Sequence, residues 1–358
     1  MPVPSPASGA SAALRDGVLS VPVIDISPFR MPYADEAARA GVVRQVDDAA
    51  RTVGFMQVTG HGIPDCVLEE LTDATDAFFA LDPAAKARYR CPPGINRGYT
   101  PPRAESLASS LGLASAADLF EAVNVGSCAA DYPGLDLPAD VYAANVYPAE
   151  VDDFEGAVTA WFRAAGAVAR TMTRIFGVAL GGSESFFAPF TDHSIDVLRM
   201  NNYRLPAAGV ELEPAQLGMG AHTDYGIVTV LWADQVPGLE ILGADAAWHP
   251  VLPAGGALLV NLGDALARWT NDQWISTMHR VAPPRVDGEL VPRRSAAFFH
   301  DGNADAVIEP LPGCVSDRSP ARYEPVTIGE HLAAKLAGSR GGQLNPDAAR
   351  EAARLLPA

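Results

Sequence analysis

The stretch AHTDYGIVTVLWADQVPGLEI (residues 221–241) decides the fold of the second half of the chain. It contains short apolar runs that turn residues separate from one another, a spacing typical of strands in an antiparallel sandwich or barrel. Similar runs lie on both sides of it, namely VLRMNNY (197–203), ALLVNLG (257–263) and SAAFFH (295–300). The sequence after residue 196 is therefore predicted to be mainly β.

The first half of the chain has helical patterns instead. They cover residues 35–52, 65–79 and 152–176, and the longest repeats apolar residues every three or four positions. Short apolar runs at 21–26 and 54–59 predict strands, whereas CPPGINRGYTPP (91–102) contains too much Pro and Gly for regular structure and is expected to be a long loop. The pattern predicts a mainly β (α+β) protein, either an α+β arrangement or a β-sandwich whose helices pack on one outer face.

Composition excludes several classes of function. The 358 residues carry 26 Lys plus Arg against 43 Asp plus Glu, a formal net charge of −17, which disfavours nucleic acid and anionic membranes as partners. The only two lysines, Lys86 and Lys335, lie in no context that favours Schiff-base chemistry. The four cysteines form no CxxC pair and are read as reduced thiols. With no leader or membrane-spanning stretch, the sequence predicts a cytoplasmic protein.

Three potential metal ligands lie in the β-rich half. His222 and Asp224 are spaced i and i+2, so that on an extended strand end they project from the same side, and His279 follows later in the chain. Two histidines and one carboxylate can occupy one face of an octahedral metal and leave three positions open, as in non-haem Fe(II) oxygenases. The same ligands also bind zinc, although no HExxH motif accompanies them.

The motifs around these ligands identify a family. HTD at 222–224, GD followed by RWTN between 263 and 271, HRV at 279–281 and RRS at 293–295 occur in this order, after VPVIDIS and GFMQVTGHGIP near the start. In this combination the chain resembles the iron- and 2-oxoglutarate-dependent dioxygenases of the isopenicillin N synthase-like family. The resemblance implies a double-stranded β-helix, or jelly roll, with flanking helices and an N-terminal helical region. It also implies that His222, Asp224 and His279 bind Fe(II).

The resemblance also assigns the co-substrate site. Arg293 and Ser295 match the RxS pair that in the family binds the distal carboxylate of 2-oxoglutarate, while Arg294 should face the other way. Asn201 and Tyr203 match positions that reach the co-substrate, although Asn202 stands where the family usually has Tyr. The implied reaction consumes 2-oxoglutarate and O2, releases succinate and CO2, and hydroxylates, desaturates or cyclises a small organic molecule, as in secondary metabolism. No catalytic residue is assigned beyond the metal ligands.

The substrate site is the least determined by the sequence. We expect the loop at 91–102 to help form a lid, with Tyr99 and Arg103 contacting the substrate, and Phe299 to share the side of its strand that carries Ser295. The remaining histidines are read as non-ligands, namely His61, His193, His249, His300 and His331. Three alternatives stay open: an iron oxidase that does not use 2-oxoglutarate, as isopenicillin N synthase is, a zinc hydrolase, and a non-enzymatic ligand-binding jelly roll.

These expectations divide the chain into four parts. Residues 1–19 are predicted to be a disordered tail, and 20–190 an N-terminal α/β region. Residues 191–330 form the jelly-roll dioxygenase core implied by the resemblance, and 331–358 a C-terminal helical segment that includes a final short helix near Pro346.

Overall fold

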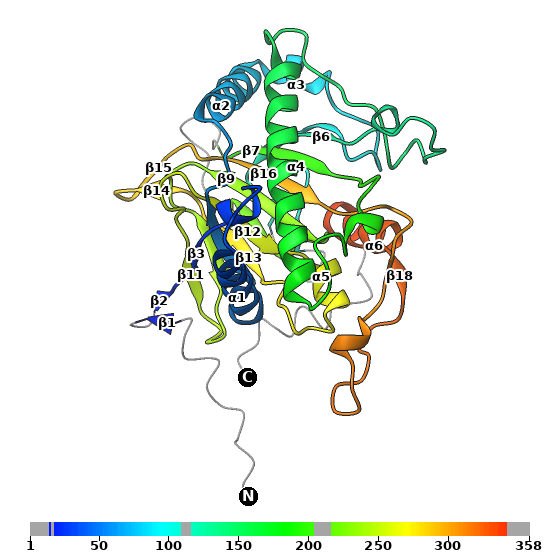
Figure 1. The fold of residues 1–358 in the computed structure, drawn as a ribbon. Helices are drawn as coiled ribbons and strands as arrows, with labels where there is room; N and C mark the ends of the chain where they lie inside the picture. The colour runs from blue at the N-terminus through cyan, green and yellow to red at the C-terminus, as the bar shows by residue number, and fades with distance from the viewer. Residues whose placement is uncertain (1–13, 16–17, 109–115, 204–215, 342–358) are drawn as a thin grey trace, which may run out of the picture.

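Two sheets form the centre of the computed structural model, which describes residues 14–15, 18–108, 116–203 and 216–341 (Figure 1). The large sheet has the strand order β3 (Val23–Asp25), β4 (Phe55–Thr59), β12 (Leu258–Leu262), β9 (Val228–Ala233), β16 (Arg294–His300), β7 (Val197–Asn202), β6 (Glu121–Gly126) and β5 (Gly98–Thr100). The smaller sheet has the order β11 (Trp248–Pro250), β10 (Leu239–Leu242), β13 (His279–Val281) and β8 (Met219–His222). Apart from the parallel pair β3 and β4, neighbouring strands in both sheets are antiparallel. The predicted jelly-roll core with flanking helices is confirmed.

Helices cover the outer face of the large sheet. The helices α1 (Glu36–Thr52), α2 (Asp65–Ala80) and α4 (Phe154–Ala179) lie close to the predicted ranges, and α4 runs along the sheet in Figure 1. Each presents an apolar stripe, and Trp161 and Phe176 of α4 are buried with Phe298 of the sheet in the helix-side core. At the start of α1, the side chain of Asp35 accepts a hydrogen bond from the backbone N–H of Ala37.

A second core lies between the two sheets. Phe55 and Leu259 of the large sheet pack there with Ile241 and Val281 of the smaller one. Because side chains alternate along a strand, the residues between those of the helix-side core project toward this inner space. This alternation divides each strand of the large sheet into an outer, helix-covered face and an inner face that looks toward the smaller sheet.

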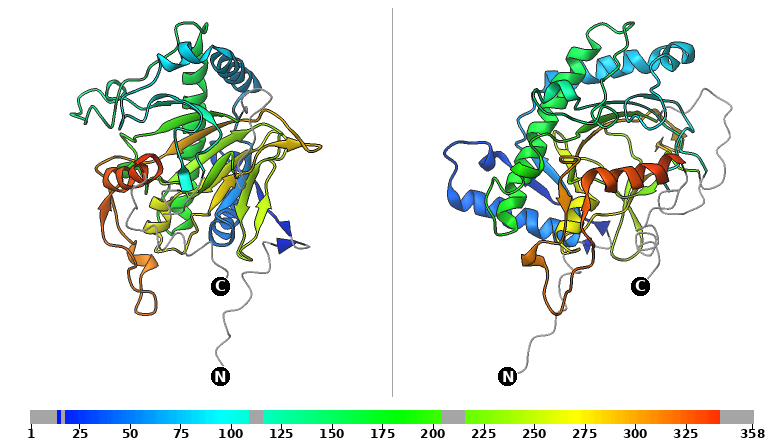
Figure 2. Two further views of the ribbon diagram at one scale, coloured as in Figure 1. Left: turned by 180° about the vertical axis from the view of Figure 1, so that it is seen from behind. Right: turned by 90° about the vertical axis from the view of Figure 1, so that its right-hand side faces the viewer.

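Short elements complete the fold. The helices are α3 (Pro83–Ala87), α5 (Asp264–Trp269) and α6 (Ile328–Gly341), and the strands are β1 (Leu14–Arg15), β2 (Val18–Leu19), β14 (Arg285–Val286), β15 (Glu289–Leu290), β17 (Val307–Ile308) and β18 (Val326–Thr327). Figure 2 shows α6, in red, at an end of the sheets and apart from α1 and α2. No helix within the described ranges combines the length and apolarity needed to cross a bilayer.

Two expectations about local structure were wrong in part. The loop at 91–102 contains β5, because Gly98–Thr100 finds a hydrogen-bonding partner in β6 that the local sequence does not reveal. Most of the predicted tail lies outside the described residues, but β1 and β2 pair with each other, so structure begins before Val21. The final helix near Pro346 also lies outside the described residues.

Candidate metal and co-substrate site

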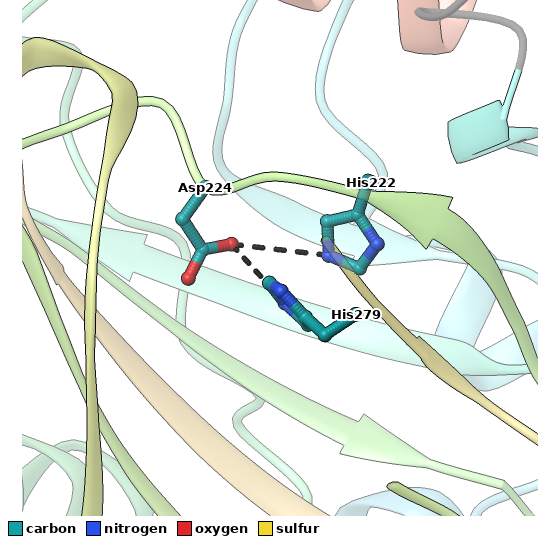
Figure 3. Close-up of side chains that lie close together, drawn as sticks. All are labelled: His222, Asp224 and His279. Carbon is teal, nitrogen blue, oxygen red and sulfur yellow. Dashed lines mark ion pairs between the residues drawn. The ribbon is translucent and has the colours of Figure 1, made fainter. Parts of the chain in front are cut away.

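The smaller sheet brings the two candidate histidine ligands together. His222 ends β8 and His279 begins β13, and the register of these strands pairs the two residues directly. Asp224 lies two residues beyond β8, and Figure 3 shows the two rings and the carboxylate pointing toward one another. Asp224 Oδ1 is 3.8 Å from His222 Nε2 and 3.6 Å from His279 Nε2. Among the described residues, this is the one group of three that could hold a metal ion.

Backbone carbonyls fix which ring nitrogen faces the centre. His222 Nδ1 is 2.8 Å from the carbonyl oxygen of Gly220, and His279 Nδ1 is 3.1 Å from that of Thr277. Each Nδ1 therefore carries the proton and donates, so that the lone pair of Nε2 points toward Asp224. Burial and the nearby His279 lower the pKa of His222 to about 4, which keeps this ring neutral at pH 7 as a metal ligand requires.

The carboxylate of Asp224 is oriented in the same way. Its Oδ2 accepts hydrogen bonds from Thr229 Oγ1 at 2.5 Å and from Asn261 Nδ2 at 2.7 Å, which leaves Oδ1 directed at the histidines. Its backbone carbonyl accepts from the N–H of Asp264 at 2.8 Å. Thr229 and Asn261 lie on neighbouring strands, β9 and β12, and their register pairs them directly. Sequence reasoning missed both residues, whose inward orientation follows from the strand register.

A buried ion pair supports this segment from behind. Lys335 of α6 is 2% exposed, and its Nζ lies 2.8 Å from Asp264 Oδ2, which also accepts a hydrogen bond from Thr223 Oγ1 at 3.0 Å. Burial opposes the ionisation of Asp264, but the charges of Lys335 and His331 outweigh it and lower its pKa to about 2. The pair thus ties α6 to the HTD segment. Apart from the rarity of lysine, no feature of the sequence indicated this role.

The predicted co-substrate residues meet on the inner face of β16 and β7. Arg293 is buried, and within the described part of the chain its Nε and Nη1 have no hydrogen-bond partner. Its guanidinium carbon lies 5.1 Å from the centre of the Tyr203 ring. Ser295 pairs in register with Asn201, whose Nδ2 donates to Ser295 Oγ at 3.3 Å. A buried cation with unused N–H groups beside a hydroxyl has the donor set that grips a carboxylate.

The side chains of Arg294 and Tyr203, which lie next to these donors, have partners of their own. Arg294 is partly exposed and forms ion pairs with Asp76 and Asp234, away from Arg293. The Tyr203 hydroxyl lies 3.8 Å from Met219 Sδ, and burial raises the pKa of its phenol, so it stays protonated.

The three predicted substrate residues do not meet. Tyr99 pairs with Val123 on the helix-side face, packs edge-on against Phe78, and donates its hydroxyl to Glu121 Oε2 at 2.7 Å. Arg103 is exposed. Phe299 is half-buried and pairs with Thr229, so it shares the inner face with Ser295 as expected. Side chains alternate along β5, and Tyr99 projects from the helix-covered face of the large sheet. Its side chain therefore points away from the candidate metal ligands.

The remaining histidines have other partners. His193 and His249 lie beside aspartates, and His300 Nδ1 is 2.9 Å from Asp196 Oδ1. His61 Nε2 is 2.9 Å from the carbonyl oxygen of Gly256, and His331 contributes to the charge around Asp264. None of them belongs to the candidate metal group of the described residues.

Two family models match the chain, and together they cover most of it. Residues 21–150 match the N-terminal region described as non-haem dioxygenase in morphine synthesis, and residues 195–302 match the 2OG-Fe(II) oxygenase superfamily. The second match contains His222, Asp224, His279, Arg293 and Ser295.

Characterised relatives agree with these matches. The chain is 34% identical over 313 residues to the 2-oxoglutarate-Fe(II) type oxidoreductase hxnY of Emericella nidulans, covering 86% of each chain. It is 31% identical to the validamycin A dioxygenase of Streptomyces hygroscopicus subsp. limoneus, covering 88% of this chain and 86% of that protein. The crystal structure of a full-length Neurospora crassa protein in complex with alpha-KG and thymine superposes with a TM-score of 0.78 at 28% identity, covering 91% of this chain and 99% of that one.

Proposed function

The chain belongs to the 2-oxoglutarate- and Fe(II)-dependent oxygenases, and from this premise we propose which of its residues carry the reaction. His222, Asp224 and His279 hold the Fe(II). Arg293 and Ser295 bind the distal carboxylate of 2-oxoglutarate, with Asn201 and Tyr203 beside them. The enzyme oxidises a small organic molecule and releases succinate and CO2.

One observation carries the co-substrate assignment: the unused N–H groups of Arg293. A buried guanidinium that lacks partners is costly, and a carboxylate accepting from Nε and Nη1 would relieve that cost. Two neutral imidazoles and one carboxylate also leave a ferrous site with a net charge of about +1, which favours an anionic co-substrate. Both features favour 2-oxoglutarate over the iron oxidases that do without it.

The protein groups supply orientation. Bound iron supplies the activation of dioxygen and, with 2-oxoglutarate, the oxidising equivalent for the substrate. Gly220 and Thr277 hold the histidine rings through their carbonyls, while Thr229 and Asn261 hold the carboxylate. Each ligand thus has one atom directed inward and its other polar atom bound to protein, which keeps the ligand set fixed before metal and co-substrate bind.

We also propose the metabolic role of the enzyme, the kind of partner it binds and its cellular compartment. The similarity to the validamycin A dioxygenase supports a substrate from secondary metabolism. The net charge of −17 supports a small molecule rather than nucleic acid as the partner. All four cysteines are free, which supports a reducing cytoplasmic compartment.

Arg293→Lys tests the co-substrate assignment. Lysine keeps the charge but loses the planar bidentate geometry, so we expect the 2-oxoglutarate concentration for half-maximal succinate formation to rise about 10-fold or more. Arg294→Lys is the matched control, because its side chain pairs with Asp76 and Asp234 instead, and it should leave this concentration unchanged. An unchanged value for Arg293→Lys would contradict the assignment.

A further inference from the structure

The inner face of β6 carries polar groups that the iron and co-substrate sites do not use. Val123 and Val125 of β6 belong to the helix-side core, so Asn124 and Gly126 project from the inner face. This face is continuous with the one that carries Ser295, because the strands between them keep their register without interruption.

A row of directly paired residues connects the iron ligands to Gly126. Thr229, which binds Asp224, pairs with Phe299; Phe299 pairs with Val197; and Val197 pairs with Gly126. Directly paired residues project from the same face of a sheet. Gly126 therefore lies at the level of the iron site along the strands, three strands away from Thr229.

Arg97 occupies the space over Gly126. A Cβ at Gly126 would lie 2.5 Å from the guanidinium carbon of Arg97, so only glycine leaves room for it. Arg97 is 5% exposed, and its Nη1 and Nη2 donate to the carbonyl oxygens of Asn96 and Ser127 at 2.8 and 2.6 Å. Among the residues that the structure describes, its Nε has no hydrogen-bond partner and no carboxylate lies within ion-pair distance of it.

The neighbouring arginines differ from Arg97 because they share an acid. Glu105 accepts from Arg199 Nη2 at 2.7 Å and from Arg340 Nε at 3.0 Å, one on each carboxylate oxygen. Their charges lower the pKa of Glu105 although its burial opposes this. Arg97 is thus the buried guanidinium of this group whose charge the described residues do not pair.

Asn124 offers an unused acceptor beside Arg97. Its Nδ2 donates to Asn96 Oδ1 at 2.7 Å, whereas its Oδ1 is buried and receives no hydrogen bond from any residue in the described ranges. Asn96 Oδ1 also accepts from Arg340 Nη2 at 2.7 Å, which fixes the amide of Asn96 and, through it, that of Asn124. A buried acceptor held in this way can receive a hydrogen bond from a ligand N–H or O–H.

Asp301 offers a second unused acceptor on the side of the iron ligands. It follows β16 two residues beyond Phe299, and its carboxyl group fills the space over Gly226, where a Cβ would lie 2.0 Å from Oδ1. Asp301 is 7% exposed, and no hydrogen bond to its carboxyl oxygens is found among the described residues. Burial and the nearby charges of Asp196 and Asp224 raise its pKa well above the usual range.

We propose that Arg97, Asn124 and Asp301 form a substrate-recognition surface, and that the substrate is a small carboxylic acid that also carries a hydroxyl or amino group. The substrate carboxylate pairs with Arg97 through Nε, and its hydroxyl or amino hydrogens are donated to Asn124 Oδ1 and Asp301. Glycines at positions 126 and 226 make room for the side chains of Arg97 and Asp301. This inference rests on the proposed function, because it names the substrate class of the same iron site.

Binding of matched acid and amide pairs tests the substrate class. The probes are 2-hydroxy and 2-amino monocarboxylic acids of graded size, each with its primary amide, titrated calorimetrically into anaerobic protein loaded with Fe(II) and saturating 2-oxoglutarate. The amide keeps the size and the donors but removes the charge. We expect at least one acid to bind about 10-fold or more tightly than its amide, because a charge-assisted hydrogen bond is lost. Equal binding of every pair, or no binding by any acid, would overturn the proposal.

Three variants locate the preference. Arg97→Gln should abolish the difference between acid and amide, and Gly126→Ala should weaken it by displacing the guanidinium without removing its charge. Arg318→Gln, an exposed arginine on the far loop after η5 (Pro312–Cys314), removes the same charge and should keep the full preference. If Arg97→Gln retained the preference for the acid, Arg97 would not be the carboxylate partner.

A separate titration distinguishes this inference from the proposed function. The 2-oxoglutarate affinity of Arg97→Gln reports on the Arg293 site, with which Arg97 shares no contact among the described residues. Intact 2-oxoglutarate binding with lost acid preference supports the surface. Intact 2-oxoglutarate binding with an unchanged preference contradicts the surface alone, and failure of wild-type protein to bind 2-oxoglutarate contradicts the proposed function.

Discussion

The proposed iron ligands belong to the smaller sheet and the segment after β8, the substrate-recognition surface belongs to the inner face of the large sheet, and the two regions treat their buried polar atoms differently. At the iron site, each ligand has its second polar atom bound by the protein, as with Asp224 Oδ2 and the two Nδ1 atoms. At the recognition surface, Arg97 Nε and Asn124 Oδ1 are buried and find no hydrogen-bond partner among the residues described. In a metal site the protein itself makes the hydrogen bonds that orient each ligand. In a site for an organic molecule, some buried polar atoms are left to form hydrogen bonds with that molecule.

The largest effect is expected at the ligands themselves. His279→Ala removes one of three ligands, and no other histidine lies near enough to replace it among the described residues. We expect anaerobic titration with Fe(II) to detect no specific binding to this variant. His61→Ala is the control, since His61 contacts the backbone of Gly256 and should leave the titration unchanged. If His279→Ala bound Fe(II) with wild-type affinity, His279 would not be a metal ligand and the proposed iron site would be wrong.

The support behind the iron site is expected to matter next. Lys335→Met leaves the buried carboxylate of Asp264 without its cation, and breaking such a pair costs about 3–5 kcal/mol of unfolding free energy. Denaturant unfolding measures this loss, and Fe(II) titration of the folded variant should show weaker binding, because Asp264 donates its N–H to the carbonyl of Asp224.

Lys86→Met is the matched comparison. Lys86 forms the other buried lysine ion pair, with Glu121 at 2.8 Å, on the helix-side face of the large sheet. Its loss should destabilise the fold by a similar amount and leave Fe(II) affinity unchanged. Equal effects of both variants on iron would show that the link from α6 to the HTD segment is structural and has no role in positioning the ligands.

The sequence alone was enough to propose the iron and co-substrate residues, because they are close in the chain or belong to ordered motifs. His222 and Asp224 form one triplet, Arg293 and Ser295 another, and His279 begins a recognisable HRV. Strand alternation then predicted the side on which Arg294 and Phe299 project, as the register shows. The helices were predicted for a similar reason, since each is long enough for its apolar repeat to be read locally.

The recognition surface could not be predicted in this way. Arg97, Asn124 and Asp301 come from three separate segments, which the pairing of β5 with β6, of β6 with β7 and of β7 with β16 brings to one face. Tyr99 shows that the direction of a side chain in a short strand is hard to predict. Because β5 has three residues, a shift of one position in the alternation decides whether the Tyr99 side chain faces the helices or the smaller sheet. The roles of Gly126 and Gly226 could not be predicted from the sequence either, because each leaves space for a side chain that is distant in the chain.

The smallest effect is expected where one hydrogen bond orients a ligand that has a second support. Thr229→Val keeps the shape of the side chain but removes the hydroxyl that donates to Asp224 Oδ2, while Asn261 still donates to the same atom. Loss of such an orienting partner costs about 10- to 100-fold in metal affinity, and the remaining amide places the expected loss near the lower end, about 10-fold. Competition against a chelator of known Fe(II) affinity measures it, with Thr72→Val of α2 as the control, because that hydroxyl binds the carbonyl of Glu69 on the helix surface. If Thr229→Val bound Fe(II) as tightly as the wild type, the hydrogen bond from Thr229 would not be needed to orient Asp224, and the amide of Asn261 would be sufficient to hold Oδ2.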